Sequence, residues 1–229
     1  MRDGCGRGGG KARIFELGRN SSRKVDDGVT LRSQSEATAR GQSQEIDPPV
    51  TDDAQRMLAE SDVVHSAEAV QAALARLAAE IEARLAGRFP LVLGVMGGAV
   101  VFAGQLLPRI AFPLEFAAIE ATRYGPRLSG ADIDWRLAPR EHVRGRTVLV
   151  LDDILDEGIT LRAIVDRVRA MGAAEVQVAV FAEKDTGRPK PVAADFVGLR
   201  VPNRFVFGFG MDARGLWRNL PAIHALRES

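Results

Sequence analysis

The stretch VLVLDDILDEGITL, from Val148 to Leu161, gives the clearest indication of how this chain of 229 residues folds. Its apolar half is typical of a strand buried in a parallel sheet, and the apolar run stops at Asp152 and Asp153. A glycine and a threonine follow, where the next helix, TLRAIVDRVRAMG, is predicted to begin. A strand that runs through a glycine-bearing turn into a helix N-terminus is a common site for a phosphate group.

Strands and helices alternate on both sides of this stretch. VHSAEAVQAALARLAAEIEARLAG places apolar residues at three- and four-residue spacing, which predicts an amphipathic helix closed by Gly87. PLVLGVM, FPLEFAAIEA and EVQVAVFAE are typical of strands, and GGAVVFAGQLL turns on two glycines into another helix. This alternation favours an α/β fold with a mainly parallel, twisted sheet flanked by helices. In such sheets ligands bind beyond the carboxyl ends of the strands, where the opening stretch lies.

The two ends of the chain differ from this core. DFVGLRVPNRFVFGFGMD predicts two short strands joined by PN, so we expect a small cap, or hood, from about residue 195 to 229, with or without the N-terminal segment. Residues 1–55 are rich in Gly, Ser, Gln and Arg and lack apolar periodicity, which predicts a disordered extension before a domain at 56–229. An idle extension is favoured over an RNA-binding tail because acids nearly balance its bases, and a true start near Met57 is an alternative.

Composition excludes several classes of partner. A formal net charge of +1 gives no reason to expect nucleic acid or an anionic membrane. No apolar stretch approaches the roughly 18 residues that cross a bilayer. The single cysteine, Cys5, fits a reducing compartment, so we expect a cytoplasmic protein. The three histidines show no metal-ligand spacing, and no P-loop is present.

The acids of the opening stretch indicate which ligand its turn would take. Backbone amides from Glu157 to Thr160, with the helix dipole, suit a phosphate monoester, and Gly158 lets the backbone approach it. Acids would repel a bare phosphate, so they should face another part of the ligand. Adjacent carboxylates at Asp152 and Asp153 suit a ribose diol, or Mg²⁺ beside a pyrophosphate. We therefore predict a phosphorylated ribose, against the alternative of a helix cap with incidental surface acids.

At this point the stretch resembles the phosphoribosyl-pyrophosphate (PRPP) motif of type I phosphoribosyltransferases. From about Ser61 onward, the chain resembles the hypoxanthine (6-oxopurine) phosphoribosyltransferases in five ordered blocks: GVMGGAVVFAGQLL, TRYG, the opening motif, VFAEKD and RFVFGFGMD…WRNL. The resemblance implies the type I phosphoribosyltransferase fold and a Mg²⁺-dependent purine-salvage reaction. In that reaction hypoxanthine or guanine and PRPP give IMP or GMP and pyrophosphate. A homodimer or homotetramer is also implied. Two alternatives stay open: a PRPP-binding regulatory protein without catalysis, and an enzyme that prefers xanthine.

The resemblance implies roles for individual residues. Asp156 would be the general base or acid beside the purine imidazole ring. Asp152 and Asp153 would bind the ribose hydroxyls, and Arg218 would contact pyrophosphate. The full set of implied PRPP-binding residues is Asp152, Asp153, Glu157, Gly158, Ile159, Thr160, Gly97, Gly98 and Arg218.

The same resemblance implies a purine pocket, a metal ligand and a lid. Lys184, on the loop after VAVFAE, would donate to the six-oxo oxygen and so select hypoxanthine and guanine over adenine. Phe205 would stack on the base, and the Val206 backbone would read its edge. Asp212 would hold a second Mg²⁺. The lid would be a mobile loop at about 122–134, beginning with Arg123 and Tyr124.

Two positions depart from the family pattern. The pyrophosphate loop reads Met96-Gly97-Gly98-Ala99, where a polar residue and two glycines are more usual, so the Ala99 methyl is expected to crowd the turn or the ligand. Glu157 stands where many members have Thr or Ser, which removes one hydroxyl donor. Both departures leave the predicted class unchanged and bear on how strongly PRPP binds.

Overall fold

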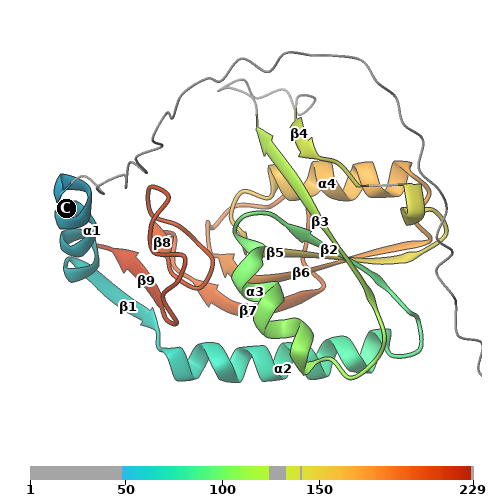
Figure 1. Cartoon of the computed structure of the whole chain (residues 1–229), viewed down its shortest axis with the longest axis horizontal. Helices are drawn as coiled ribbons and strands as arrows, with labels where there is room; N and C mark the ends of the chain where they lie inside the picture. The colour runs from blue at the N-terminus through green and yellow to red at the C-terminus, as the bar shows by residue number, and fades with distance from the viewer. Residues whose placement is uncertain (1–47, 124–132, 140, 228–229) are drawn as a thin grey trace, which may run out of the picture. The chain divides into compact units, whose positions relative to one another are not determined.

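The computed structural model describes residues 48–123, 133–139 and 141–227, which form two sheets and the helices around them (Figure 1). The six-stranded sheet contains, in spatial order, β4 (Ile133–Leu137), β3 (Glu115–Arg123), β2 (Leu91–Val95), β5 (Thr147–Leu155), β6 (Glu175–Lys184) and β7 (Phe196–Val201). The three-stranded sheet contains β1 (Ser61–His65), β9 (Ile223–Leu226) and β8 (Val206–Phe207). The helices are α1 (Pro48–Ala59), α2 (Ala67–Leu85), α3 (Ala99–Leu106) and α4 (Ile159–Ala170), with short 3-10 turns at Leu107–Arg109 and Glu141–Val143.

The large sheet is parallel from β3 to β7, and only the edge strand β4 runs antiparallel to its neighbour. The mainly parallel α/β fold predicted from the sequence is therefore confirmed. The connection from β2 through α3 leads to β3 on one side, and the connection from β5 through α4 leads to β6 on the other. The direction of winding thus reverses between β2 and β5, and such a switch point opens a crevice at the carboxyl ends of the strands.

Each face of the large sheet has its own apolar core. Leu149 and Leu151 of β5 pack with the buried residues of α2 and α3, whereas Val148 and Val150 pack with those of α4. This alternation along one strand is the two-residue period of β structure, with both faces covered by helices. The helix α2 follows the predicted apolar spacing, and its first turn is capped by Ser66, whose hydroxyl accepts from the Ala69 amide at 3.3 Å.

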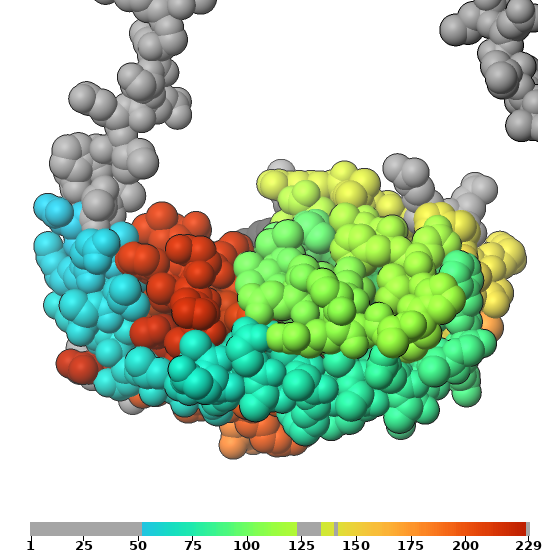
Figure 2. Space-filling view, turned by 60° about the horizontal axis from the view of Figure 1, so that its bottom comes forward, coloured from blue at the N-terminus to red at the C-terminus, as the bar shows by residue number. Residues whose placement is uncertain are grey.

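Figure 2 shows the face along which α2 runs, in teal, with the C-terminal residues in red between α1, in blue, and α3, in green. The small sheet, called the hood below, contains β8 and β9 from the segment for which we expect a hood. Phe196–Val201 belongs to the large sheet as β7, because Gly198 lets that strand lie against β6, where a Cβ would come within 2.3 Å of the Phe181 carbonyl oxygen. The hood takes β1 in its place, which pairs antiparallel with β9.

The N-terminal boundary also differs from the prediction. Residues 48–55, assigned to the disordered extension, belong to the helix α1, and the Trp217 indole donates to the Ala54 carbonyl at 3.0 Å. Most of the predicted extension, and the lid residues 124–132 with Tyr124, lie outside the described residues. Arg123 is the last residue of β3. Across the described parts of the chain, no helix combines the length and apolar character needed to cross a membrane.

Candidate active site

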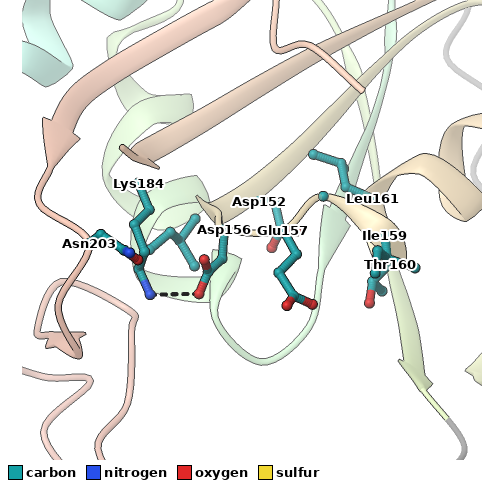
Figure 3. Close-up of a pocket in the computed structure, with 10 residues that line it drawn as sticks. Asp152, Asp156, Glu157, Ile159, Thr160, Leu161, Lys184 and Asn203 are labelled. Atoms are coloured by element: carbon teal, nitrogen blue, oxygen red, sulfur yellow. Dashed lines mark hydrogen bonds and ion pairs between the residues drawn. The ribbon is translucent and has the colours of Figure 1, made fainter. Parts of the chain in front are cut away.

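The turn between β5 and α4 is built around a glycine. Gly158 precedes the first residue of α4 with φ of 79°, a conformation that favours glycine, and a Cβ there would come within 3.0 Å of the Leu155 side chain. Amides in the first turn of a helix have no partner inside it, so this turn presents donors to an anion. The turn lines a cavity of about 420 Å³ (Figure 3), formed by Asp152, Ile154, Asp156, Glu157, Gly158, Ile159, Thr160, Leu161, Lys184 and Asn203.

Asp152 and Asp153 lie on β5 itself, which continues to Leu155 and so past the predicted end of the strand. Because successive strand residues point to opposite faces, the two carboxylates have different surroundings. Asp152 lines the cavity, whereas Asp153 lies under the loop that follows β2, where a Cβ on Gly98 would overlap its carboxylate. The Asp153 amide donates to Asp152 Oδ1 at 3.0 Å, and the Ile154 amide donates to Asp153 Oδ1 at 2.8 Å.

The two aspartates are held in surroundings that oppose their ionisation. Burial, followed by the neighbouring charge of Asp153, raises the pKa of Asp152 well above its usual range. Burial also raises the pKa of Asp153, although its hydrogen bonds and the charge of Arg218 act in the opposite direction. A ligand that donates hydrogen bonds to these carboxylates, as a sugar diol does, would stabilise their charged form.

The loop after β2 meets the aspartates and the turn at the switch point. Position 98 requires glycine because the backbone there lies directly against the Asp153 side chain. The Gly98 carbonyl in turn lies where a Cβ on Gly210 would fall. Gly97 has open space around its α-carbon and precedes Gly98 after a cis Met96-Gly97 peptide bond. Ala99, the first residue of α3, is fully buried. Its methyl therefore lies inside the protein, and the expected effect of Ala99 on the turn or the ligand stays a prediction.

Arg218 connects this loop to the hood side of the site. Its guanidinium lies 2.5 Å from Asp212 Oδ1 and 3.8 Å from Asp153 Oδ2, and it donates to the Gly210 carbonyl at 2.5 Å. Asp212 Oδ2 accepts from the Gly215 amide at 2.7 Å. The structure therefore brings together Arg218, Asp153 and Gly98, three of the residues that the resemblance implies for PRPP binding.

Lys184 and Asp156 form an ion pair at the other end of the cavity, with 2.6 Å between Nζ and Oδ2 (Figure 3). Lys184 is the last residue of β6 rather than a loop residue, and its side chain is only 13% exposed. The neighbouring strands β5 and β6 thus place the predicted proton-transfer group and the predicted oxo-group donor in direct contact. Figure 3 also places Asn203 beside Lys184.

The two residues predicted to contact the purine from β8 and its start, Phe205 and Val206, do not line the cavity. Phe205 is 52% exposed and is not one of the residues that line the cavity, while Val206 is buried in β8. Sequence reasoning did not select Ile154, Leu161 and Asn203, which do line it. Ile154 and Leu161 carry only the apolar signal of ordinary core residues. Asn203 stands in the PN dipeptide, and its place just before the predicted purine-binding strand was the available signal.

The site has carboxylates suited to Mg²⁺ but no complete cage for a metal. Within the described ranges, no group of three or more His, Cys, Asp or Glu side chains is arranged to hold an ion. Mg²⁺ is commonly bound through one or two carboxylates together with substrate phosphates and water, so a cage is not required. Asp152 and Asp153 supply such oxygens, whereas Asp212 already faces Arg218 and the Gly215 amide.

The family model of the phosphoribosyl transferase domain matches residues 60–214, which include the large sheet, the turn before α4 and Asp212, but not Arg218. The chain belongs to the phosphoribosyl transferase family.

Two relatives and a solved structure support this assignment. A hypoxanthine-guanine phosphoribosyltransferase of Bacillus subtilis is 34% identical over 166 residues, covering 72% of this chain and 92% of the relative. The bifunctional protein TilS/HprT of Listeria innocua is 37% identical over 166 residues, covering 72% of this chain but 26% of that protein, so the chain spans about a quarter of its length. A solved hypoxanthine-guanine-xanthine phosphoribosyltransferase has a TM-score of 0.63 and 30% identity, covering 73% of this chain and 97% of the other. The resemblance to 6-oxopurine phosphoribosyltransferases is thereby confirmed.

Replacing Asp152 with Asn should stabilise this phosphoribosyltransferase in the absence of ligand at pH 7. Because the pKa of Asp152 is raised on folding, ionisation destabilises the folded state, and the cost grows as pH rises above the pKa of the unfolded chain. We expect a gain on the order of 1 kcal/mol in the free energy of unfolding, or roughly 2–4 °C in Tm. Below about pH 4, where the unfolded carboxyl is also protonated, the difference should disappear.

Thermal unfolding of both proteins between pH 3.5 and 8 measures this effect. Asp166→Asn is the control, because Asp166 is an exposed aspartate on α4 paired with Arg162 at 2.6 Å. Loss of this surface ion pair should lower the free energy of unfolding by less than about 1 kcal/mol. An Asp152→Asn protein less stable than wild type at pH 7 would contradict the prediction.

Proposed function

We propose that the chain is a purine-salvage transferase that converts hypoxanthine, guanine or both, together with PRPP, into IMP or GMP and pyrophosphate. One observation carries this proposal: the Asp156–Lys184 pair lies in the same cavity as the glycine-bearing turn at the N-terminus of α4. A protein that held only a phosphorylated ribose would need the turn and the aspartates. It would have no need for a nearly buried lysine and a carboxylate directed at a base.

The turn and the aspartates would hold the sugar phosphate. Amides from Glu157 to Thr160, together with the Thr160 hydroxyl, would bind the 5′-phosphate, and the helix dipole favours its negative charge. Asp152 and Asp153 would accept hydrogen bonds from the ribose hydroxyls. Gly97, Gly98 and Arg218 would face the pyrophosphate. Mg²⁺, if bound by these carboxylates and the substrate, would offset the charge that develops on the departing pyrophosphate.

The Asp156–Lys184 pair would recognise and activate the base. An ammonium carries three donors and no acceptor, so Lys184 can donate to Asp156 and to a six-oxo oxygen at once, but it cannot accept from the amino group of adenine. Asp156 would take the proton from the imidazole ring as the ring nitrogen bonds to C1′ and the bond from C1′ to the pyrophosphate oxygen breaks. Phe205 and Val206 are proposed to stack on the base and to read its edge from β8.

A PRPP-binding regulatory protein without catalysis is the rival from a different class. It is disfavoured because Lys184 is directed into the cavity rather than toward solvent. A preference for xanthine stays open, because xanthine also carries a six-oxo group that Lys184 could bind. We further propose a cytoplasmic homodimer or homotetramer, which rests on the family resemblance.

Incubation of the full chain with PRPP, Mg²⁺ and each of four bases tests the proposal directly. We expect nucleoside monophosphate from hypoxanthine or guanine and none from adenine, measured by chromatography of the products. Product from xanthine alone would move the assignment to the xanthine-preferring alternative. Tight PRPP binding without product from any base would favour the regulatory protein.

Asp156→Asn should reduce turnover by about 10- to 10⁴-fold, because the amide cannot take up the imidazole proton. The fold should survive, since the Asp156 side chain is 46% exposed and an amide oxygen can still accept from Lys184. Steady-state kinetics with saturating substrates measure the change, and circular dichroism checks the fold. Asp185→Asn, on the loop directly after Lys184, is the matched control and should retain wild-type turnover. An Asp156→Asn enzyme with full turnover would rule out the assigned role.

Lys184→Ala should raise the KM for hypoxanthine or guanine by about 10-fold or more. A hydrogen bond from a charged donor contributes roughly 1.5–3 kcal/mol, and 1.4 kcal/mol corresponds to a factor of ten. The KM for PRPP should change much less, because Lys184 lies at the end of the cavity away from the phosphate turn (Figure 3). Arg188→Ala is the control for loss of a nearby cation. If base preference and base KM both stay at wild-type values, Lys184 does not read the oxo group.

A further inference from the structure

A second lysine, Lys190, lies behind the Asp156–Lys184 pair, and none of the roles described so far involves it. Its ammonium donates to the Lys184 carbonyl at 2.6 Å and to the Leu155 carbonyl at 3.0 Å. The side chain is only 11% exposed. One buried cation thus bridges the backbone of Lys184 to the backbone of the residue directly before Asp156.

The position of this bridge follows from the sheet. Leu155 and Glu183 are the last paired residues of β5 and β6, so the ladder ends just before Asp156 on one strand and just before Lys184 on the other. Beyond this point the two backbones diverge into the α4 turn and the 185–195 connection, and no ladder hydrogen bond sets their separation. Lys190 reaches back from that connection and holds the two chain segments together where the sheet no longer does.

Among the described residues, the Lys190 ammonium forms an ion pair with one carboxylate, that of Glu183. Glu183 Oε1 lies 3.7 Å from Lys190 Nζ, and Glu183 Oε2 lies 3.3 Å from Arg200, whose side chain is 78% exposed. Glu183 itself is 21% exposed. An ammonium that is nearly buried, paired and bonded to two carbonyls has few donors left for a ligand, so its action on the site is through the backbone it holds.

We propose that Lys190 is a positioning residue for base recognition: it fixes the backbone spacing between β5 and β6 that brings the Asp156 carboxylate and the Lys184 ammonium together. The inference rests on the proposed function and extends it, because it places part of the control of base binding outside the cavity that holds the base. The 2.6 Å contact between the two side chains depends on two backbones that the Lys190 ammonium holds by hydrogen bonds of similar length.

Lys190→Met tests this role, because methionine keeps the length and apolar stem of lysine and removes the ammonium. We expect the KM for hypoxanthine or guanine to rise at least about 5-fold, with the KM for PRPP changed by less than 2-fold. A purely structural role would lower the Tm and leave the KM values of the folded enzyme unchanged. Lys190→Arg, which restores a cation and its donors, should recover most of the base affinity.

Arg200→Met is the matched control, because it removes a cation from the same carboxylate, Glu183, and leaves both carbonyl contacts of Lys190 in place. It should have wild-type KM values for base and PRPP. Hydrogen exchange without substrate gives an independent measure. In Lys190→Met the amides of residues 154–158 and 184–188 should exchange faster, including the Thr186 amide that donates to the Lys184 carbonyl.

The outcomes separate the two proposals. If wild type makes no nucleotide from any base, the proposed function fails, and the exchange experiment decides the role of Lys190 alone. Unchanged exchange in both segments, or an unchanged base KM in an active Lys190→Met enzyme, overturns the inference. If Lys190→Met does not fold, Lys190→Gln takes its place with the same measurements and the same criteria.

Discussion

The central constraint in this structure is that β5 lies at the point where the sheet reverses its winding, between β2 and β6. A strand in this position must be apolar where helices cover both of its faces, yet its carboxyl end faces the crevice where ligands bind. The same nine residues therefore pass from a core of Leu and Val to two partly buried aspartates within a single strand. Burial raises the pKa of both aspartates, and the loop after β2 lies over one of them, so this edge of the sheet disfavours their charged forms.

Around this strand end, each neighbour supplies one part of the candidate site. α4 presents its first-turn amides, β6 presents Lys184, and the connection between β8 and β9 presents Asp212 and Arg218. Lys184 and Arg218 are cationic, Asp212 is anionic and the amides are neutral donors, and the three segments that carry them are far apart in the sequence. The parallel ladder sets their spacing as far as Leu155 and Glu183, and beyond it side-chain contacts such as those of Lys190 hold the backbone. Base recognition is thus proposed to depend on residues in the cavity and on the framework just behind it.

Much of the fold, and most of the residues that line the cavity, could be predicted from the sequence because the local signals were strong. The apolar spacing of α2 and the strand-turn-helix pattern at Gly158 fixed those elements correctly, and the position of Gly158 agrees with its φ of 79°. Other features could not be read locally. Phe196–Val201 and Val206–Phe207 have similar patterns but belong to different sheets, because Gly198 allows close contact with β6 and the chain crosses to the hood after it. The place of the Ala99 methyl inside the protein could not be read locally either, because burial depends on packing and not on sequence position.

The sequence by itself determined the groups available at this site: a glycine-bearing turn at a helix N-terminus, adjacent carboxylates, a donor-only lysine and the family to which their pattern belongs. Residue type and spacing suffice for this, because propensity, period and motif are properties of neighbouring residues. Only the tertiary structure decided how those groups meet. It turned Asp152 and Asp153 to opposite faces of one strand, joined Asp156 to Lys184, and placed Lys190 where the β5–β6 ladder ends. These contacts link residues tens of positions apart, and their distances follow from strand register and packing, which no local pattern encodes.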